Sequence, residues 1–146
     1  MPALRIDPDT TVTELDLPQT DAFCQIRVHV GSPDVVDQGV YHRRAVLHRD
    51  GSGRTLGLPQ NLVGWALASA WRGVARYPLA GTVVVTGCTA DGEVTALDDD
   101  LVEHVQAVAD AVRETLERWR RRPPVSDEAA IGELLAYAAR DVASSR

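Results

Sequence analysis

The sequence of 146 residues contains no lysine, only two cysteines and no long apolar run. Without lysine there is no GK[ST] phosphate-binding loop, because that loop reaches the phosphates through its lysine. Cys24 and Cys88 lie far apart in the sequence and belong to no CxxC pair. This spacing excludes a disulfide framework and a zinc knuckle, and we expect two buried free thiols.

Membrane, export and nucleic-acid signals are also missing. No stretch approaches the roughly 20 apolar residues of a membrane-spanning helix, and the most apolar segment, residues 62–75, is interrupted by Arg72 and two glycines. The first ten residues lack the basic and apolar regions of a signal peptide, so we expect a cytoplasmic protein. The net charge of −6 argues against general nucleic-acid binding, which needs a basic surface.

What remains is an ordinary globular composition, with 45% hydrophobic and 25% charged residues. A chain of this length suits one domain. Residues 1–20 contain three prolines, several aspartates and threonines and no sustained period, which predicts an extended N-terminal arm. We therefore expect a single α+β domain over residues 21–146.

Two predicted strands and a short third one follow the arm. Residues 22–30 (AFCQIRVHV) alternate between apolar and polar side chains, which is typical of a half-buried strand. Residues 40–49 continue this pattern except at Arg43, which indicates a bulge or an edge strand. The turn sequence at residues 50–53 predicts a hairpin that returns through residues 54–58.

A helix is predicted to begin at Pro59 and to end at Tyr77 and Pro78. Its apolar arc is too wide for one contact surface, so the helix must be buried on more than one side. It lies either between the sheet and a later helix or between the sheet and a partner subunit. The second alternative makes Trp65, Trp71 and Arg72 candidate interface residues.

The second half of the chain predicts a second hairpin and two helices. Residues 82–90 are rich in β-branched side chains, as in a central strand, and Asp91 and Gly92 form a hairpin signal. Aspartates at residues 98–100 begin a helix that ends before Pro123, and residues 127–142 form the last helix. The order β-β-β-α-β-β-α-α predicts a mainly antiparallel sheet of about five strands with helices packed on one face.

The candidate ligand site is the polar face of the first two strands. If the register holds, one face carries two arginines and three histidines, a set that suits an anion or general acid–base chemistry. The simpler interpretation is a solvated outer face. His42 and His48 are about 20 Å apart along an extended strand, too far to share a metal ion, so no metal site is expected. The five residues are Arg27, His29, His42, Arg44 and His48.

A nucleophilic site is a further candidate. Cys88 could meet His29 or His48 from a neighbouring strand, although alternation directs its side chain toward the core. The acidic stretch at residues 98–100 resembles a cation site, but helix capping accounts for it without a metal.

Three classes of function stay open at this point. The sequence favours a non-catalytic interaction or ligand-binding protein without a cofactor, which assembles with itself or with another protein. The alternative is a small enzyme, or a pocket for an anionic ligand, that uses the histidines and arginines named above. The third is an acidic antitoxin or immunity protein, which the size and charge permit.

Overall fold

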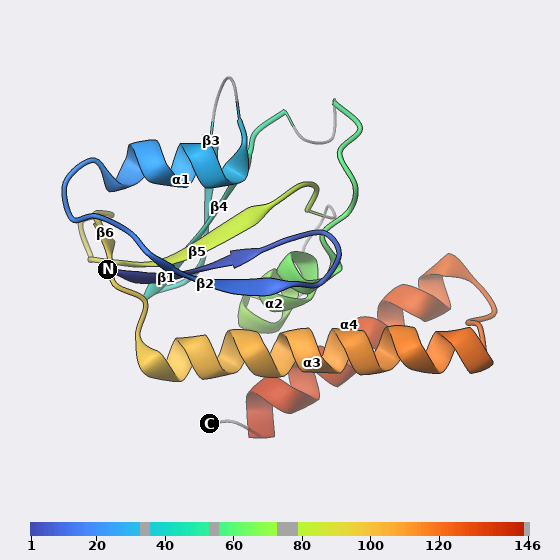
Figure 1. The fold of residues 1–146 in the computed structure, drawn as a ribbon. Helices are drawn as coiled ribbons and strands as arrows, with labels where there is room; N and C mark the ends of the chain where they lie inside the picture. Colours follow the sequence, from blue (N-terminus) through green and yellow to red (C-terminus); the bar gives the residue numbers. More distant parts are fainter. Residues whose placement is uncertain (33–35, 53–55, 73–78, 145–146) are drawn as a thin grey trace.

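The computed structural model describes residues 1–32, 36–52, 56–72 and 79–144, with only the backbone described at residue 135 and residues 137–144. Within these residues, six strands form one sheet in the order β2-β1-β5-β4-β3, with β6 beside the end of β5 (Figure 1). Every pairing among them is antiparallel. The elements are β1 (Pro2–Ile6), β2 (Val12–Asp16), α1 (Ala22–Val30), β3 (Val36–His42), β4 (Ala45–Asp50), α2 (Leu62–Arg72), β5 (Val83–Cys88), β6 (Val94–Thr95), α3 (Asp99–Arg121) and α4 (Asp127–Ser144).

The predicted fold class is confirmed: the chain is an α+β protein built on a mainly antiparallel sheet. The hairpin at β5 and β6 is confirmed, and β5 is hydrogen-bonded on both sides, by β1 and β4. The helices predicted after residues 98–100 and at residues 127–142 are present as α3 and α4.

The first 20 residues are not the extended arm that we predicted. They form the hairpin of β1 and β2, and β1 lies inside the sheet between β2 and β5. Leu4 and Ile6 are fully buried in the main core, so this hairpin contributes apolar packing as well as backbone hydrogen bonds. The prolines misled the prediction because Pro2 is the first residue of its strand, a position that proline tolerates.

Residues 22–30 are helix α1, and the strand predicted there is wrong. Its buried residues are Ala22, Ile26 and Val30, which are spaced four apart and form one helical stripe. The same residues also satisfy a period of two, so periodicity alone does not separate the alternatives. Gly31, with φ +74°, ends the helix and donates its N–H to the carbonyl of Arg27, which is a helix C-terminal signal.

The helices cover both faces of the sheet. α2, α3 and α4 lie on one face as predicted, and α1 lies on the opposite face (Figure 1). Along β5 the side chains alternate between the two cores, because Val83 and Val85 belong to the larger core and Val84 to the smaller. The smaller core is completed by Ile26 and Val30 of α1.

The strand predicted at residues 40–49 is instead two strands. β3 ends at His42 and β4 begins at Ala45, with Arg43 in the turn between them. The edge position is present, since β3 is an outer strand, whereas the register shift lies between Gly39 and His42 and the turn, not a bulge, accounts for Arg43. The predicted strand at residues 54–58 lies partly outside the described residues, and Leu56 begins a turn there.

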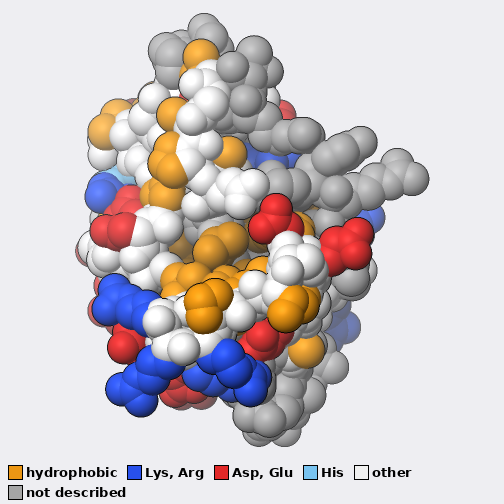
Figure 2. Space-filling view, turned by 90° about the vertical axis from the view of Figure 1, so that its right-hand side faces the viewer, with side chains coloured by type: hydrophobic (Ala, Val, Ile, Leu, Met, Phe, Trp, Pro, Cys, Tyr) orange, Lys and Arg blue, Asp and Glu red, His pale blue; other side chains and the backbone are white. Residues whose placement is uncertain are grey.

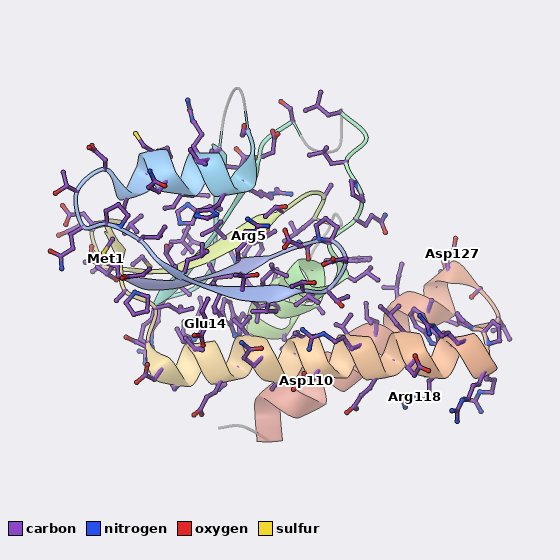
Figure 3. The ribbon with its side chains drawn as sticks, in the orientation of Figure 1. Met1, Arg5, Glu14, Asp110, Arg118 and Asp127 are labelled. Carbon is purple, nitrogen blue, oxygen red and sulfur yellow. The ribbon has the colours of Figure 1, made fainter. Side chains whose placement is uncertain are left out.

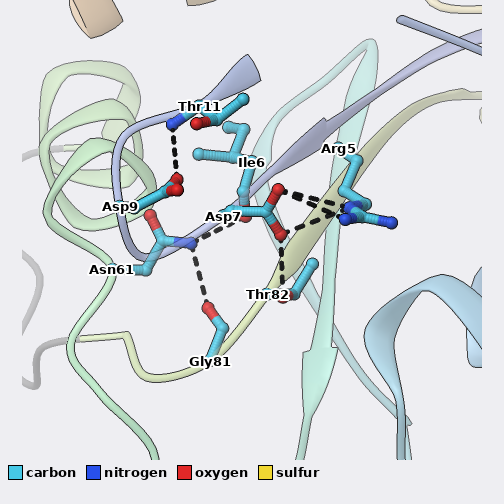
Figure 4. A network of polar contacts seen from close by, with 8 residues as sticks. All are labelled: Arg5, Ile6, Asp7, Asp9, Thr11, Asn61, Gly81 and Thr82. Carbon is cyan, nitrogen blue, oxygen red and sulfur yellow. Dashed lines mark hydrogen bonds and ion pairs between the residues drawn. The ribbon is translucent and has the colours of Figure 1, made fainter. Parts of the chain in front are cut away.

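Asn61 fixes the start of α2 to the end of the sheet (Figure 4). Its side-chain amide nitrogen donates to the carbonyls of Ile6 and Gly81, both at 2.9 Å. Its side-chain oxygen accepts the N–H of Gly64 at 2.9 Å, as an N-cap residue does. Close by, Asp7 accepts from Arg5 and Thr82, so that β1, β5 and α2 are joined at one point.

Of the two alternatives for α2, the structure shows the first, a helix between the sheet and later helices of the same chain. α2 lies against the sheet and is covered by α3 and α4, with Ala66, Leu67 and Ala68 fully buried. The width of its apolar arc is therefore explained by intramolecular packing. In the described part of the chain no helix combines the length and the apolar composition needed to cross a bilayer.

Candidate functional site

The predicted polar face of histidines and arginines does not form one surface. Because residues 22–30 are a helix, Arg27 and His29 lie on α1, where Arg27 is exposed and His29 is half-buried. His42 lies at the end of β3 and contacts α2 on the other face of the sheet, with its ring centroid 5.1 Å from that of Trp71. The structure therefore separates the α1 residues from His42.

Arg44 already has two carboxylate partners within the chain. Its guanidinium lies 2.7 Å from Asp98 and 2.8 Å from Asp100, at the start of α3. These hydrogen bonds raise the pKa of Arg44 and lower the pKa of the Asp100 carboxyl. The positive charge expected to attract an anionic ligand is thus balanced by two negative charges.

His42 and His48 both favour the neutral imidazole. Burial, followed by the nearby charge of Arg44, lowers the pKa of His42, whose Nδ1 accepts the backbone N–H of Arg44 at 3.0 Å. His48 is completely buried beneath α1, and burial lowers its pKa to about 4. Its Nε2 lies 2.8 Å from the Thr86 hydroxyl, and the edge of its ring contacts Phe23. His48 therefore has the environment of a packed core residue.

The cysteines do not form the predicted pair of buried thiols. Cys24 is exposed on α1 and Cys88 is half-buried. The thiol of Cys88 lies 3.5 Å from the backbone carbonyl of Arg43. A carbonyl accepts the S–H proton but does not remove it, so this contact offers no base to activate a nucleophile.

Asp98 and Asp100 lie at the start of α3, where the capping prediction places them. However, the side chain of Asp98 makes no cap hydrogen bond to the helix. Both carboxylates bind Arg44 instead. No group of three or more histidine, cysteine, aspartate or glutamate side chains within the described ranges is arranged to hold a metal ion.

The candidate interface residues on α2 have different environments. Trp65 is 6% exposed and belongs to the core, whereas Trp71 is half-buried against His42. Arg72 is exposed and donates to the backbone carbonyl of Val40 at 2.9 Å, an interaction that ties α2 to the edge strand β3. These three side chains do not form one continuous apolar surface.

A hollow that sequence reasoning did not predict lies where α2, α3 and α4 meet. Its volume is about 520 Å³, and its apolar wall continues the core of the protein. Core residues Trp65 and Leu134 line it together with half-buried side chains that are packed against the same core. The lining residues are Gln60, Leu62, Trp65, Trp119, Asp127, Ala130, Ile131 and Leu134.

The hollow opens at the end of the molecule where α3 ends and α4 begins. Figure 2 shows hydrophobic side chains gathered in a depression on this side, with arginine side chains below it. Arg118 on α3 and Asp127 at the start of α4 mark the same end in Figure 3. Among the lining residues whose side chains the structure describes, only Gln60 and Asp127 are polar, apart from the tryptophan N–H groups, and both are exposed.

Comparison of the chain with protein-family models, curated proteins and solved structures finds no significant match.

Proposed function

We propose that this chain is a non-catalytic ligand-binding protein whose site is the hollow between α2, α3 and α4. The observation that carries the proposal is the composition of the hollow, in which core residues Trp65 and Leu134 line a solvent-open depression. An apolar ligand placed there would extend the core and remove the half-buried faces of Leu62, Trp119 and Ile131 from water. Its volume of about 520 Å³ lies in the range of small-molecule sites.

Two features of the other candidate site support binding without catalysis. Arg44 is paired with Asp98 and Asp100, and His48 is buried against Thr86. A catalytic centre needs a nucleophile or an acid–base group that is accessible and near its partner. The hollow contributes aromatic and aliphatic walls, which recognise shape and apolar surface.

The proposal can be tested with the neutral fluorescent probe N-phenyl-1-naphthylamine, which is brighter in apolar surroundings. The wild-type chain should bind the probe with saturable fluorescence enhancement. Ala130→Phe places a large side chain in the hollow and should weaken binding by about tenfold or more, which corresponds to about 1.4 kcal/mol. Ala129→Phe is the matched control, because Ala129 is the preceding residue of α4 and does not line the hollow.

Both variants should retain the wild-type circular dichroism spectrum. Absence of saturable binding by the wild-type chain, or equal binding by A130F, would contradict the proposal. The expected homo-oligomer stays a prediction, and light scattering in the same buffer tests it. A dimer that A130F converts to monomer would assign the hollow to a subunit interface instead of a ligand site.

A further inference from the structure

A second, smaller hollow shares Trp119 with the apolar one. Its volume is about 290 Å³, and Trp119 is the one residue among those described that lines both. Apart from this indole, the described residues that line the second hollow all have charged side chains, whose carbon stems form most of its wall. These are Arg118, Arg121, Arg122 and Glu133. An apolar depression and a basic one therefore meet at one aromatic ring.

The positive charge at this end contrasts with the rest of the chain. The protein has a net charge of −6, yet four of its fifteen basic residues are arginines within residues 118–122. Arg120 points elsewhere, since it pairs with Glu117 and does not line the hollow. The described contacts include no carboxylate partner for Arg121 or Arg122.

Two negative contributions oppose these arginines. Glu133 lies in the same hollow, and the carbonyl end of α3 carries the negative end of the helix dipole, equivalent to roughly half a charge. The guanidinium groups of Arg121 and Arg122 alone outweigh one carboxylate and this partial charge. The end of α3 around the second hollow is thus positive, and planar guanidinium groups suit the paired oxygens of a carboxylate or sulfate.

Building on the proposed function, we infer that the ligand is an amphipathic anion, such as a long-chain alkyl carboxylate. The alkyl chain lies in the apolar hollow against Leu62, Trp65 and Ile131. The anionic group lies beyond Trp119, where Arg121 and Arg122 bind it. A neutral or cationic head group would gain nothing from the second hollow, so charge sets the specificity and the apolar hollow sets the affinity.

Three compounds with a ten-carbon chain test this inference: decanoate and decyltrimethylammonium, each below its critical micelle concentration, and decanol below its solubility limit. Each is titrated against wild-type protein loaded with N-phenyl-1-naphthylamine, and the loss of probe fluorescence gives its affinity. Decanoate should bind about tenfold more tightly than decanol, and decyltrimethylammonium should bind most weakly. Added salt should reduce the advantage of decanoate, because ions screen exposed charges.

The double variant Arg121→Gln and Arg122→Gln tests whether these two side chains contact the anionic group of the ligand. It should lower decanoate affinity to that of decanol and leave decanol unchanged. Arg120→Gln is the control for charge, because it removes one positive charge, half of what the double variant removes, from the same helix end without touching the hollow. It should change decanoate affinity by less than about twofold, as expected for an exposed charge.

Each alternative result overturns the inference in a recognisable way. Equal wild-type affinities for decanoate and decanol would show that the site does not prefer an anionic head group, although the apolar site would remain. A loss of binding free energy in R120Q that is half or more of the loss in the double variant would show that the general positive field of the helix end acts on the ligand, without a binding contact from Arg121 and Arg122. Failure of the probe itself to bind would contradict the proposed function on which the inference rests.

Discussion

Trp119 and Glu133 are joined across two helices: the indole Nε1 of Trp119 donates to Oε2 of Glu133 at 3.3 Å. This bond holds the shared ring at the junction of the apolar and basic hollows. It also places a carboxylate where the anionic head group is proposed to bind. Glu133 therefore orients the ring and opposes the ligand charge at the same time.

Glu133→Gln separates these two effects. The amide oxygen of glutamine can still accept the indole N–H, but the negative charge is gone. Decanoate affinity should rise by about two- to fivefold, because Glu133 is only half-buried and water still weakens the repulsion between like charges. Decanol affinity should not change. The displacement titration measures both, and a loss of decanoate affinity in E133Q would contradict the assigned position of the head group.

His48 makes stability depend on pH. Its imidazole titrates near 6.5 when exposed in the unfolded chain and near 4 when buried. Between these values the unfolded state binds the proton more readily, so stability falls as pH decreases from 6.5 to 4. The full loss is on the order of 3 kcal/mol, at about 1.4 kcal/mol per pKa unit.

Urea denaturation at a series of pH values measures the contribution of this histidine. His48→Gln keeps a side-chain group that can bond Thr86 but cannot become charged, so the decline over this pH window should be shallower. His29→Gln changes a half-buried histidine on α1 and serves as the control. Parallel pH profiles of wild type and H48Q would show that His48 is not the responsible group.

Asn61 is predicted to be the side chain whose hydrogen bonds matter most for joining α2 to the sheet. Asn61→Asp keeps the oxygen that caps α2 and removes the two donors to Ile6 and Gly81. Because residue 61 is fully buried, the carbonyls of Ile6 and Gly81 would then lose their hydrogen-bond donors and face a carboxylate. The free energy of unfolding should fall by about 3 kcal/mol or more, as for unsatisfied buried polar groups.

The neighbouring substitution Gln60→Glu provides the comparison, because it introduces the same chemical change on an exposed side chain. It should alter the unfolding free energy by less than about 0.5 kcal/mol, as is usual for surface positions. Equal urea midpoints for wild type and N61D would contradict the role assigned to these hydrogen bonds.

The elements that the sequence predicts correctly are those whose apolar residues fit either the helical period or the strand period, but not both. β5 contains a run of valines, and α3 keeps a helical stripe of apolar residues over its full length. In α1 the apolar residues fit both periods, and the decision depends on packing of Ile26 and Val30 against the sheet. β1 was missed because five residues beside prolines give too little pattern.

The candidate site was beyond sequence reasoning for a related reason. Trp65, Trp119 and Ile131 belong to three different helices, and their common hollow arises from how α2, α3 and α4 pack. Periodicity identified each of these helices but not their crossing. The helix dipole alone explains arginines before Pro123, so their place in the wall of the second hollow could not be inferred from the sequence.

The most direct test of the central claim, that the apolar hollow is a ligand site, is an NMR titration of the three tryptophan indole N–H signals with N-phenyl-1-naphthylamine. Trp65 and Trp119 line the hollow, and Trp71 lies outside it against His42. The account predicts that the Trp65 and Trp119 signals shift together and saturate, while the Trp71 signal stays in place. Unchanged signals, or an equal shift of Trp71, would contradict it.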